Sequence, residues 1–443
     1  LGVAVDGGLF KVTVVDTAHI ATYETMDGAQ INAGTLDVAN KGILTKANFT
    51  ASGSDASTFT NTGHFLNSKV TNQGNLNVLN LEAGAISTPD GEWDLRSEFA
   101  SKKGGVSYSA GPNTETYAVI LKAVKDVDVK LESTKIMPDI YSIDAGGNVK
   151  ITVAKDLDAG TINGKTVNAD IKGSFGVAEI AVDDAMHINV GEDMTVSNIL
   201  RGGDVYITVA DTFSGQSIIA DVIDVDANVI NSLYASNGDL IGGSIVSTTG
   251  NDINLKATEG IDVEQVATNG GKINLLSNYL GIRNLANNSK RDANVSINGI
   301  DGEAVSEAII GSRSGRPIWI VNSDIQNLVF NGLNNIGIKD SIIGSGKIFA
   351  ALTELNIKKD PNSKYGLIIE RFDKPSDFLF MSLVEGIQVN GLRKLNKKYR
   401  NLNANIYAND YSSKEEQKNA LDNIKSAGIS FAEVDHHEEY EKI

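Results

Sequence analysis

Val149-Lys-Ile-Thr-Val153 opens a series of short apolar segments that return about every 19 residues along the middle of the chain. The later members of the series are Val167-Asn-Ala-Asp-Ile171, Met186-His-Ile-Asn-Val190, Val205-Tyr-Ile-Thr-Val209, Val222-Ile-Asp-Val-Asp226, Ile253-Asn-Leu-Lys-Ala257 and Ile273-Asn-Leu-Leu-Ser277. Apolar and polar residues alternate within each segment, as they do in a strand with one buried face. A short, fixed period made of strands predicts a solenoid, in which each period forms one coil and the coils stack by parallel pairing.

The composition fits a long and narrow core. Hydrophobic residues make up 41% of the 443 residues and aromatic residues only 6%, so Val, Ile, Leu and Ala are expected to fill the interior. The chain has 44 glycines and 6 prolines, which suits tight corners between strands whose N–H groups must all donate. We therefore predict an all-β fold, a parallel β-helix with about 19 residues per coil.

The rhythm of the sequence suggests three zones. Residues 1–146 have less regular coils, residues 147–357 carry the regular coils, and residues 358–443 differ in character. In the last zone we predict short helices over 377–385 and 392–402, and a longer one that begins at Ser412 or Ser413 and ends at Gly428. We interpret this zone as a small mixed α/β C-terminal cap, because a bare last coil would expose a ladder of unpaired backbone groups.

Glycine and asparagine mark the expected corners. Thr60-Asn-Thr-Gly-His64 and Thr71-Asn-Gln-Gly-Asn75 are two copies of an Asn-x-Gly pattern, and Gly-Gly pairs precede strands at 146–147, 202–203 and 270–271. Glycine adopts a left-handed backbone at the lowest cost, and asparagine tolerates the same region while bonding its own backbone. Residues 91–112, which include Lys102 and Lys103, interrupt the pattern. We expect a loop or an irregular coil there, as a surface excursion in preference to a binding loop.

Charge excludes several classes of partner. The formal net charge is −17, so the surface repels nucleic acid and anionic lipid. No run of about 18 apolar residues exists, and membrane insertion is not expected. The absence of cysteine is compatible with export, because a long stacked core does not need disulfides. The chain begins at Leu1 without a methionine or a signal peptide, and we expect it to be a piece of a longer protein.

Two groups of carboxylates are candidates for catalysis or metal binding. Asp183 and Asp184 lie close in sequence to His187, and Asp221, Asp224 and Asp226 form a second group. Asp224 and Asp226 face the same side of a strand by the period of two, as Ca²⁺ ligands or an acid/base pair would. The simpler interpretation is that all of them are outward positions on an acidic surface, and we predict no catalytic residue here.

The remaining candidates are histidines and tryptophans. His436 and His437 could ligate a metal, but adjacent residues rarely converge on one ion. Trp93 and Trp319 could stack on sugars, although each stands alone and packing in the core or cap is the simpler role. Five scattered histidines and no cysteine leave nucleophilic catalysis hard to assemble. We predict no catalytic, metal or cofactor site and no bound cofactor.

The Asn-x-Gly corners, the Gly-Gly pairs followed by alternating strands, and the period near 19 resemble the filamentous haemagglutinin class of large secreted proteins. The resemblance covers roughly residues 1–345 and implies a right-handed parallel β-helix. It also implies export by two-partner secretion through an outer-membrane transporter, and a surface-associated bacterial rod that is commonly an adhesin and sometimes carries a toxin at its tip. The secretion-recognition domain of that class is absent from this sequence, and residues 358–443 show no toxin motif.

These observations predict a secreted or cell-surface bacterial adhesin-like rod that is not an enzyme. Its partner would be a glycan or protein on a host cell or neighbouring cell. Two alternatives stay open: a polysaccharide-degrading enzyme on the same scaffold, and a self-assembling surface-layer or filament protein. A shallow groove with three or more acidic groups and a nearby basic residue would favour the enzyme.

Overall fold

The protein is almost entirely parallel β-structure. The computed structural model describes residues 10–86, 96–132, 138–232, 243–248, 251–269, 271–287, 293–312 and 318–358, together with short strands between 367 and 434. The described residues form about 14 stacked turns of about 20 residues each. Among them the 3₁₀ turn η1 (Ile300–Gly302) is the single helical element. The chain divides into two compact units, Leu1–Gly215 and Gln216–Ile443.

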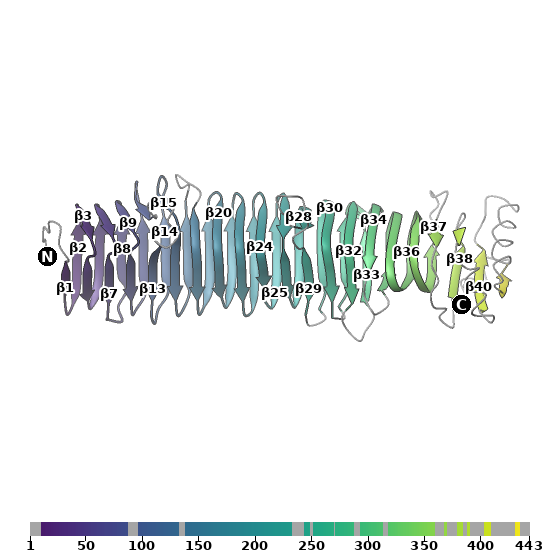
Figure 1. The fold of residues 1–443 in the computed structure, drawn as a ribbon, viewed down its shortest axis with the longest axis horizontal. Coiled ribbons are helices and arrows are strands. Elements are labelled where there is room, and N and C mark those ends of the chain that lie inside the picture. Colours follow the sequence, from purple (N-terminus) through teal and green to yellow (C-terminus); the bar gives the residue numbers. More distant parts are fainter. Residues whose placement is uncertain are drawn as a thin grey trace. The chain divides into compact units, whose positions relative to one another are not determined.

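The strands of the first unit form three rows, in which strands from successive coils lie side by side (Figure 1). The first row is β1 (Lys11–Thr13), β4 (Gln30–Ala33), β7 (Asn48–Ala51), β10 (Lys69–Asn72), β13 (Ser97–Ser101), β16 (Val119–Ala123), β18 (Asp139–Ala145), β20 (Leu157–Gly164), β22 (Phe175–Val182), β24 (Met194–Arg201) and β26 (Thr212–Gly215). The second row is β2 (Thr17–Thr22), β5 (Thr35–Asn40), β8 (Ser57–Asn61), β11 (Leu76–Asn80), β14 (Val106–Ala110), β17 (Val127–Leu131), β19 (Asn148–Val153), β21 (Thr166–Ile171), β23 (Ala185–Val190) and β25 (Asp204–Val209). A shorter third row is β3 (Thr25–Asp27), β6 (Ile43–Thr45), β9 (His64–Leu66), β12 (Ala85–Ile86) and β15 (Glu115–Thr116).

The second unit uses longer strands. They are β27 (Ser217–Ala220), β28 (Val222–Ser232), β29 (Ser244–Ser247), β30 (Ile253–Thr268), β31 (Ile273–Ser277), β32 (Tyr279–Asn287), β33 (Ala293–Asn298), β34 (Val305–Ser312), β35 (Ile318–Val321), β36 (Asp324–Lys358), β37 (Leu367–Ile369), β38 (Leu379–Leu383), β39 (Gln388–Val389), β40 (Asn403–Ala408) and β41 (Ser430–Val434). Every pairing with a resolved register is parallel, as in β28 with β30 and β30 with β31. Because one long strand pairs with two successive partners, such as β30 with β31 and β32, it forms more than one side of a coil.

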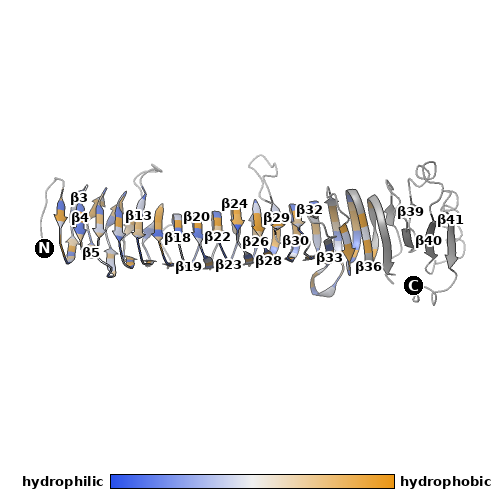
Figure 2. Ribbon diagram, turned by 90° about the horizontal axis from the view of Figure 1, so that it is seen from below, coloured by the Kyte–Doolittle hydropathy of each residue, from blue (hydrophilic) through white to orange (hydrophobic). Residues whose placement is uncertain are grey.

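The periodic series in the sequence maps onto this pairing and confirms the predicted fold, except that the member predicted to start at Val222 is shifted by one residue, so that Ile223 takes the buried position. In the first unit Val149 pairs with Val167, Val167 with Met186, and Met186 with Val205. In the second unit Ile253 pairs with both Ile223 and Ile273. All of these side chains are buried, and hydrophobic and hydrophilic positions alternate along the strands (Figure 2). The stacked apolar files are therefore the core that the alternation predicts.

The core of the first coils also contains a file of buried polar residues. Thr22 donates to Asn40, Asn40 Nδ2 donates to Asn61 Oδ1 at 2.7 Å, and Asn61 Nδ2 donates to Asn80 Oδ1 at 2.9 Å. Asn61 also donates to the Gly63 carbonyl, as the sequence predicts for an asparagine at a corner. Ala110 is the register partner of Asn80 in the next coil. From Ala110 to Val209, the residues at this position of each coil are apolar. Asn40 and Asn61 each bond both their own corner and the next coil, so this ladder joins the corners to the stacking.

Aromatic side chains fill the same part of the core. Phe49, Phe59, Phe65, Phe99 and Tyr108 are fully buried, with neighbouring ring centroids between 4.6 and 6.0 Å apart. Burial raises the pKa of the Tyr108 hydroxyl, which shares a 2.9 Å hydrogen bond with Thr116. The buried positions of β19, β21, β23 and β25, by contrast, hold aliphatic side chains and Met186.

The structure corrects the reason given for the corner glycines. Gly63 and Gly74 are not among the residues with positive φ in the described chain. Instead, a Cβ at Gly63 would lie 2.1 Å from the Gly42 carbonyl oxygen, and one at Gly74 would lie 2.1 Å from the Ser54 carbonyl oxygen. These glycines are required because the backbone of the preceding coil passes too close for any side chain.

A second type of corner contact, a hydrogen bond between a side chain and the backbone of the next coil, was not predicted from the sequence. An aspartate or asparagine just before a strand accepts a backbone N–H from the next coil, and a glycine often precedes the donor. The donor–acceptor pairs are Gly105 with Asn75, Asn148 with Asp126, Ser174 with Asp156, Thr212 with Asp193 and Lys272 with Asp252, at 2.7 to 3.0 Å. At Gly173 a Cβ would lie 2.1 Å from Asp156 Oδ1. Part of the acidic excess of the chain therefore serves to join coils.

Two other expectations were wrong in part. The segment predicted as a helix over 377–385 contains β38, which pairs with β40. A short apolar run is ambiguous between helix and strand, and strand pairing with a neighbouring coil decides it. The predicted helices over 392–402 and from Ser412 lie outside the described residues.

Within 91–112, the described residues form the regular strands β13 and β14, and Lys102 and Lys103 occupy the turn between them. The division into zones at 146 and 357 stays a prediction, although β17 and β19 pair without a break on either side of 146.

Glu98 joins three coils through two ion pairs on the first row. Its carboxylate lies 2.6 Å from Lys69 Nζ and 3.0 Å from Lys122 Nζ, and its side chain is 18% exposed. Burial alone would raise the pKa of Glu98, but the two ammonium groups outweigh that effect and hold the pKa below its ordinary value. The carboxylate therefore stabilises the fold above the pKa it has in the unfolded chain, and this contribution disappears as the pH falls through the lowered pKa.

We expect Glu98→Gln to lower the free energy of unfolding by about 1 kcal/mol at pH 7, because the substitution removes two partly exposed ion pairs. At about pH 3 the difference between the variant and the unmodified protein should be smaller, because protonation of Glu98 removes its ion pairs. Urea titrations at the two pH values measure the difference. Glu24→Gln, at an exposed turn position, serves as the control and should change stability little at either pH. An equal loss at both pH values for Glu98→Gln would contradict this account.

Candidate functional site

The outward residues of the second row form two files on the surface of the first unit. We call Asp128, Lys150, Asn168, His187 and Tyr206 the outer file, in which each residue pairs in register with the next. Lys130, Thr152, Asp170, Asn189 and Thr208 form a parallel file that we call the inner file. The period of two places both files on the solvent side of the sheet, opposite the buried valines and isoleucines.

A shallow groove of about 300 Å³ lies over these two files on β19, β21, β23 and β25. Its outward lining comes from the outer file at Lys150, Asn168, His187 and Tyr206, and from the inner file at Thr152, Asp170, Asn189 and Thr208. Four coils therefore contribute equivalent positions to one surface. The groove presents amide, hydroxyl, ammonium and carboxylate groups together with two aromatic rings.

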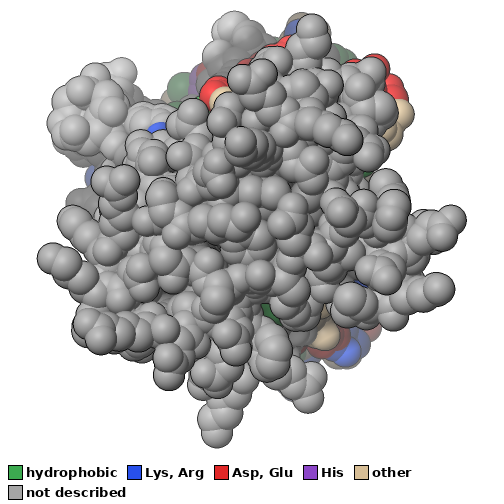
Figure 3. Space-filling view, turned by 90° about the vertical axis from the view of Figure 1, so that its right-hand side faces the viewer, with side chains coloured by type: hydrophobic (Ala, Val, Ile, Leu, Met, Phe, Trp, Pro, Cys, Tyr) green, Lys and Arg blue, Asp and Glu red, His purple; other side chains and the backbone are tan. Residues whose placement is uncertain are grey.

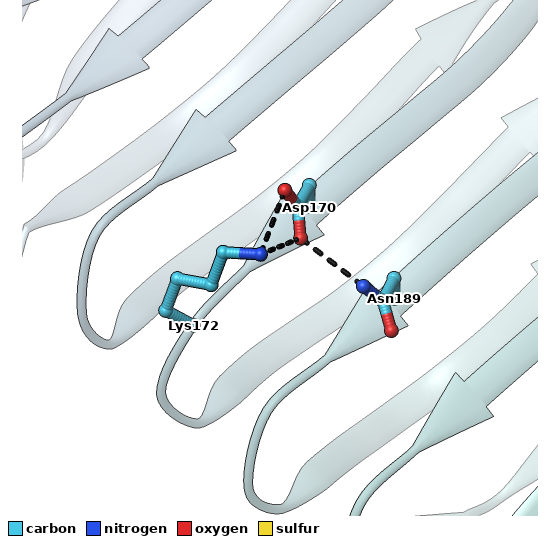
Figure 4. A network of polar contacts seen from close by, with 3 residues as sticks. All are labelled: Asp170, Lys172 and Asn189. Carbon is cyan, nitrogen blue, oxygen red and sulfur yellow. Dashed lines mark hydrogen bonds and ion pairs between the residues drawn. The ribbon is translucent and has the colours of Figure 1, made fainter.

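Asp170 is the polar centre of the groove (Figure 4). Lys172 Nζ contacts both carboxylate oxygens of Asp170, at 2.8 and 3.0 Å, and Asn189 Nδ2 donates to Asp170 Oδ1 at 3.2 Å. The hydrogen bond from Lys172 lowers the pKa of Asp170, with a further contribution from Asn189. Asp170 therefore remains a carboxylate and a hydrogen-bond acceptor at physiological pH, and it is poorly suited to donate a proton.

The two rings of the outer file lie flat against each other. The centroids of His187 and Tyr206 are 4.8 Å apart and the angle between the ring planes is 7°. This contact follows from the register, because His187 and Tyr206 are paired residues on neighbouring strands and their side chains project in the same direction. The stacked pair gives the polar groove an apolar wall.

The first predicted group of candidates does not assemble. Asp184 forms an ion pair with Lys165 at 3.6 Å, and both Asp183 and Asp184 occupy the exposed turn before β23. His187 instead stacks on Tyr206, one coil further along. Sequence reasoning identified His187 but looked for its partner among adjacent residues. In a solenoid the partner lies one period away.

Two members of the second predicted group, Asp224 and Asp226, share one face of a strand, as the period of two predicts, while Asp221 precedes that strand. Asp224 and Asp226 both project from β28, and Lys256 Nζ lies 2.8 Å from Asp226. Asp221 accepts a hydrogen bond from Thr248. Burial and the neighbouring charge of Asp226 raise the pKa of Asp224. No set of three or more His, Cys, Asp or Glu side chains within the described residues is placed to hold a metal ion.

The structure also shows an acidic cluster on the first row that the sequence analysis did not single out. Asp139 pairs in register with Asp158 across neighbouring coils, and Asp156 lies nearby. Burial raises the pKa of Asp139, and the charge of Asp158 adds to the effect, while Arg96 opposes it. Arg96 lies over the Tyr141 ring at 3.3 Å from the centroid. Asp139 and Asp158 lie one period apart, which is the spacing that would have identified them.

The other candidates have different outcomes. Trp319 projects outward from β35 and is partly exposed, and its ring packs so closely over Gly337 that a Cβ there would lie 2.3 Å from it. It therefore covers the next coil, and it is not a core residue. Trp93, His436 and His437 lie outside the described residues. A cavity of about 150 Å³ is lined by apolar side chains of the first described coils, such as Val12, Ile20 and Ile31.

Comparison with known proteins leaves the family open. No protein-family model matches the chain, and no curated protein or solved structure is significantly similar to it. Within the described residues, no helix has the length and apolar character needed to cross a lipid bilayer.

Acidic residues outnumber basic ones by 56 to 39, and acidic side chains (red) are among the described atoms visible at the upper rim in Figure 3.

Proposed function

We propose that this chain is the adhesin-like part of a bacterial exoprotein, carried to the cell surface or released from it, and that it attaches cells to a surface partner without catalysis. The parallel β-solenoid scaffold supports this proposal, and so does the resemblance of its corner and strand motifs to filamentous haemagglutinins. The observation that carries it is the groove on β19 to β25, where four coils present hydrogen-bonding groups from equivalent positions. A repeated, shallow and polar surface suits recognition of an extended partner.

The chemistry of the groove favours binding over turnover. Asp170 is the one carboxylate among the described residues that line it, and Lys172 keeps that carboxylate ionised. Hydrolysis of a glycosidic bond ordinarily requires two carboxyl groups, one of them protonated to assist the leaving group. The groove provides an acceptor, several neutral donors and a stacked aromatic pair, but no such acid.

Adhesion can be tested with the purified chain attached to beads. We expect saturable binding of the beads to bacterial or epithelial cells, competed by an excess of soluble chain, and no release of reducing ends or unsaturated products from polysaccharides incubated with the protein. Beads that bind no better than uncoated beads would count against adhesion. Sedimentation of the soluble chain as long polymers would favour the surface-layer or filament alternative.

The enzyme alternative has one observation in its favour. Asp139 and Asp158 are neighbouring carboxylates with raised pKa values, as in a site where one carboxyl group stays protonated. If a polysaccharide is cleaved, Asp158→Asn should abolish the cleavage. A cleavage that depends on Asp158 would replace the adhesin proposal with a carbohydrate-active enzyme on the same scaffold.

A further inference from the structure

We propose that the groove over β19, β21, β23 and β25 binds a glycan that carries carboxylate groups, with Lys150 as the residue that recognises the carboxylate. This inference rests on the proposed function and specifies the chemistry of its partner. It concerns one face of the first unit, and it follows from the Lys150 side chain and the hydrogen-bonding groups of that face.

Lys150 is the one lysine or arginine among the described residues that line the groove. It is exposed, it lies in the lining, and it makes no ion pair with the described residues. Asp128 is its register neighbour on β17 but contacts it in no ion pair. The charge of Asp170 is compensated by Lys172. Lys150 is thus the basic side chain of the lining that an anionic group of a ligand can pair with.

The rest of the lining suits sugar hydroxyl groups. Asn168 and Asn189 each carry a carbonyl acceptor and an NH₂ donor, and Thr152 and Thr208 add hydroxyls that donate or accept. Asn189 uses one N–H on Asp170, so its carbonyl oxygen and second N–H remain to face solvent. A ligand rich in hydroxyls can bond such mixed donors and acceptors with its own mixed groups.

The geometry favours an extended ligand over a compact one. Neighbouring coils are about 4.8 Å apart, so four coils present their equivalent side chains over roughly 14 Å. The stacked rings of His187 and Tyr206 are part of the groove lining, and an apolar sugar face can pack against aromatic rings of this kind. A short oligosaccharide with a carboxylate near Lys150 matches the length, the charge and the polarity of the lining.

The test uses oligogalacturonate and the same oligosaccharide with its carboxyl groups reduced to alcohols, measured by isothermal titration calorimetry on the full chain. We expect the unmodified protein to bind the carboxylated probe at least tenfold more tightly than the reduced probe, with affinity that falls as salt rises. Lys150→Gln should remove the preference and weaken binding of the carboxylated probe about tenfold. Asn189→Ala should weaken the binding of both probes. Lys155→Gln, at an exposed turn outside the groove, is the matched control and should behave like the unmodified protein.

Equal affinity for the two probes, binding of neither, or an equal loss in the Lys150→Gln and Lys155→Gln variants would overturn the inference. Far-UV circular dichroism shows whether each variant is folded. The bead assay separates this inference from the proposed function. If Lys150→Gln beads still adhere and the unmodified protein shows no preference for the carboxylated probe, the adhesin proposal stands and the groove assignment is lost. If the preference is present but the beads do not adhere, the groove assignment stands and the adhesin proposal is lost.

Discussion

Asn61→Ala should lower the local stability of the first unit by about 4 kcal/mol. Asn61 is fully buried and lies in the middle of the polar ladder, where it accepts from Asn40 and donates to Asn80. Removing its amide leaves an N–H of Asn40 and the side-chain oxygen of Asn80 without these partners in the core. Each orphaned buried polar group costs about 1–3 kcal/mol, and the vacated volume adds to the loss.

Hydrogen exchange measured by mass spectrometry suits this prediction, because solenoids unfold locally and a single global transition is not assured. Exchange should accelerate in peptides that span β5, β8 and β11, and remain unchanged in the coils of β21 to β25. Asn77→Ala is the matched control, since Asn77 is an exposed residue of β11 in the adjoining coil. If the two alanine variants exchange alike, the ladder does not hold these coils together.

Gly63→Ala should destabilise the same coils by about 3 kcal/mol through overpacking. The added Cβ would lie 2.1 Å from the Gly42 carbonyl oxygen and 2.7 Å from the Lys41 carbonyl carbon. Both atoms belong to the backbone, so no rotation of a side chain can relieve the contact. The same Gly42 oxygen accepts the N–H of His64, and moving it would weaken a bond that joins the coils.

Gly111→Ala provides the comparison, because the nearest atoms to a Cβ at Gly111 are 3.8 Å away, an ordinary contact distance. Thermal unfolding followed by circular dichroism should show a lower midpoint for Gly63→Ala and little change for Gly111→Ala. Similar midpoints for the two variants would mean that the backbone at Gly42 shifts easily to make room for the added Cβ. That result would contradict the explanation given for Gly63.

The repeat could be predicted from the sequence because each coil obeys the same local rule. Apolar alternation in segments such as those from Val149 and Val167 determines which face is buried, and their constant spacing determines the register. The contacts between coils were harder to foresee. The role of Gly63 depends on the carbonyl of Gly42, and the role of Asp156 depends on the N–H of Ser174, one coil away.

The candidate site shows the same limit. His187 attracted attention beside Asp183 and Asp184, but its neighbour in space is Tyr206. Lys150 and Asn189 appeared as ordinary outward residues of single strands, and only the stacking of coils brings them into one groove. Residues that act together in such a fold are found by comparing positions one or two periods apart. Clusters of adjacent residues are a poor guide.

Cysteine cross-linking across the second row tests most directly whether successive coils lie in parallel register. The natural chain has no cysteine, so introduced thiols can pair only with each other. Lys150 and Asn168 are exposed register partners on β19 and β21, and the double variant Lys150→Cys with Asn168→Cys should form an intramolecular disulfide on mild oxidation, because their Cα atoms are about 5 Å apart. The double variant Lys150→Cys with Asp170→Cys is two residues out of register, at roughly 8 Å, and should remain reduced. Cross-linking of the second pair without the first would contradict the stacked parallel solenoid on which the groove and its proposed function depend.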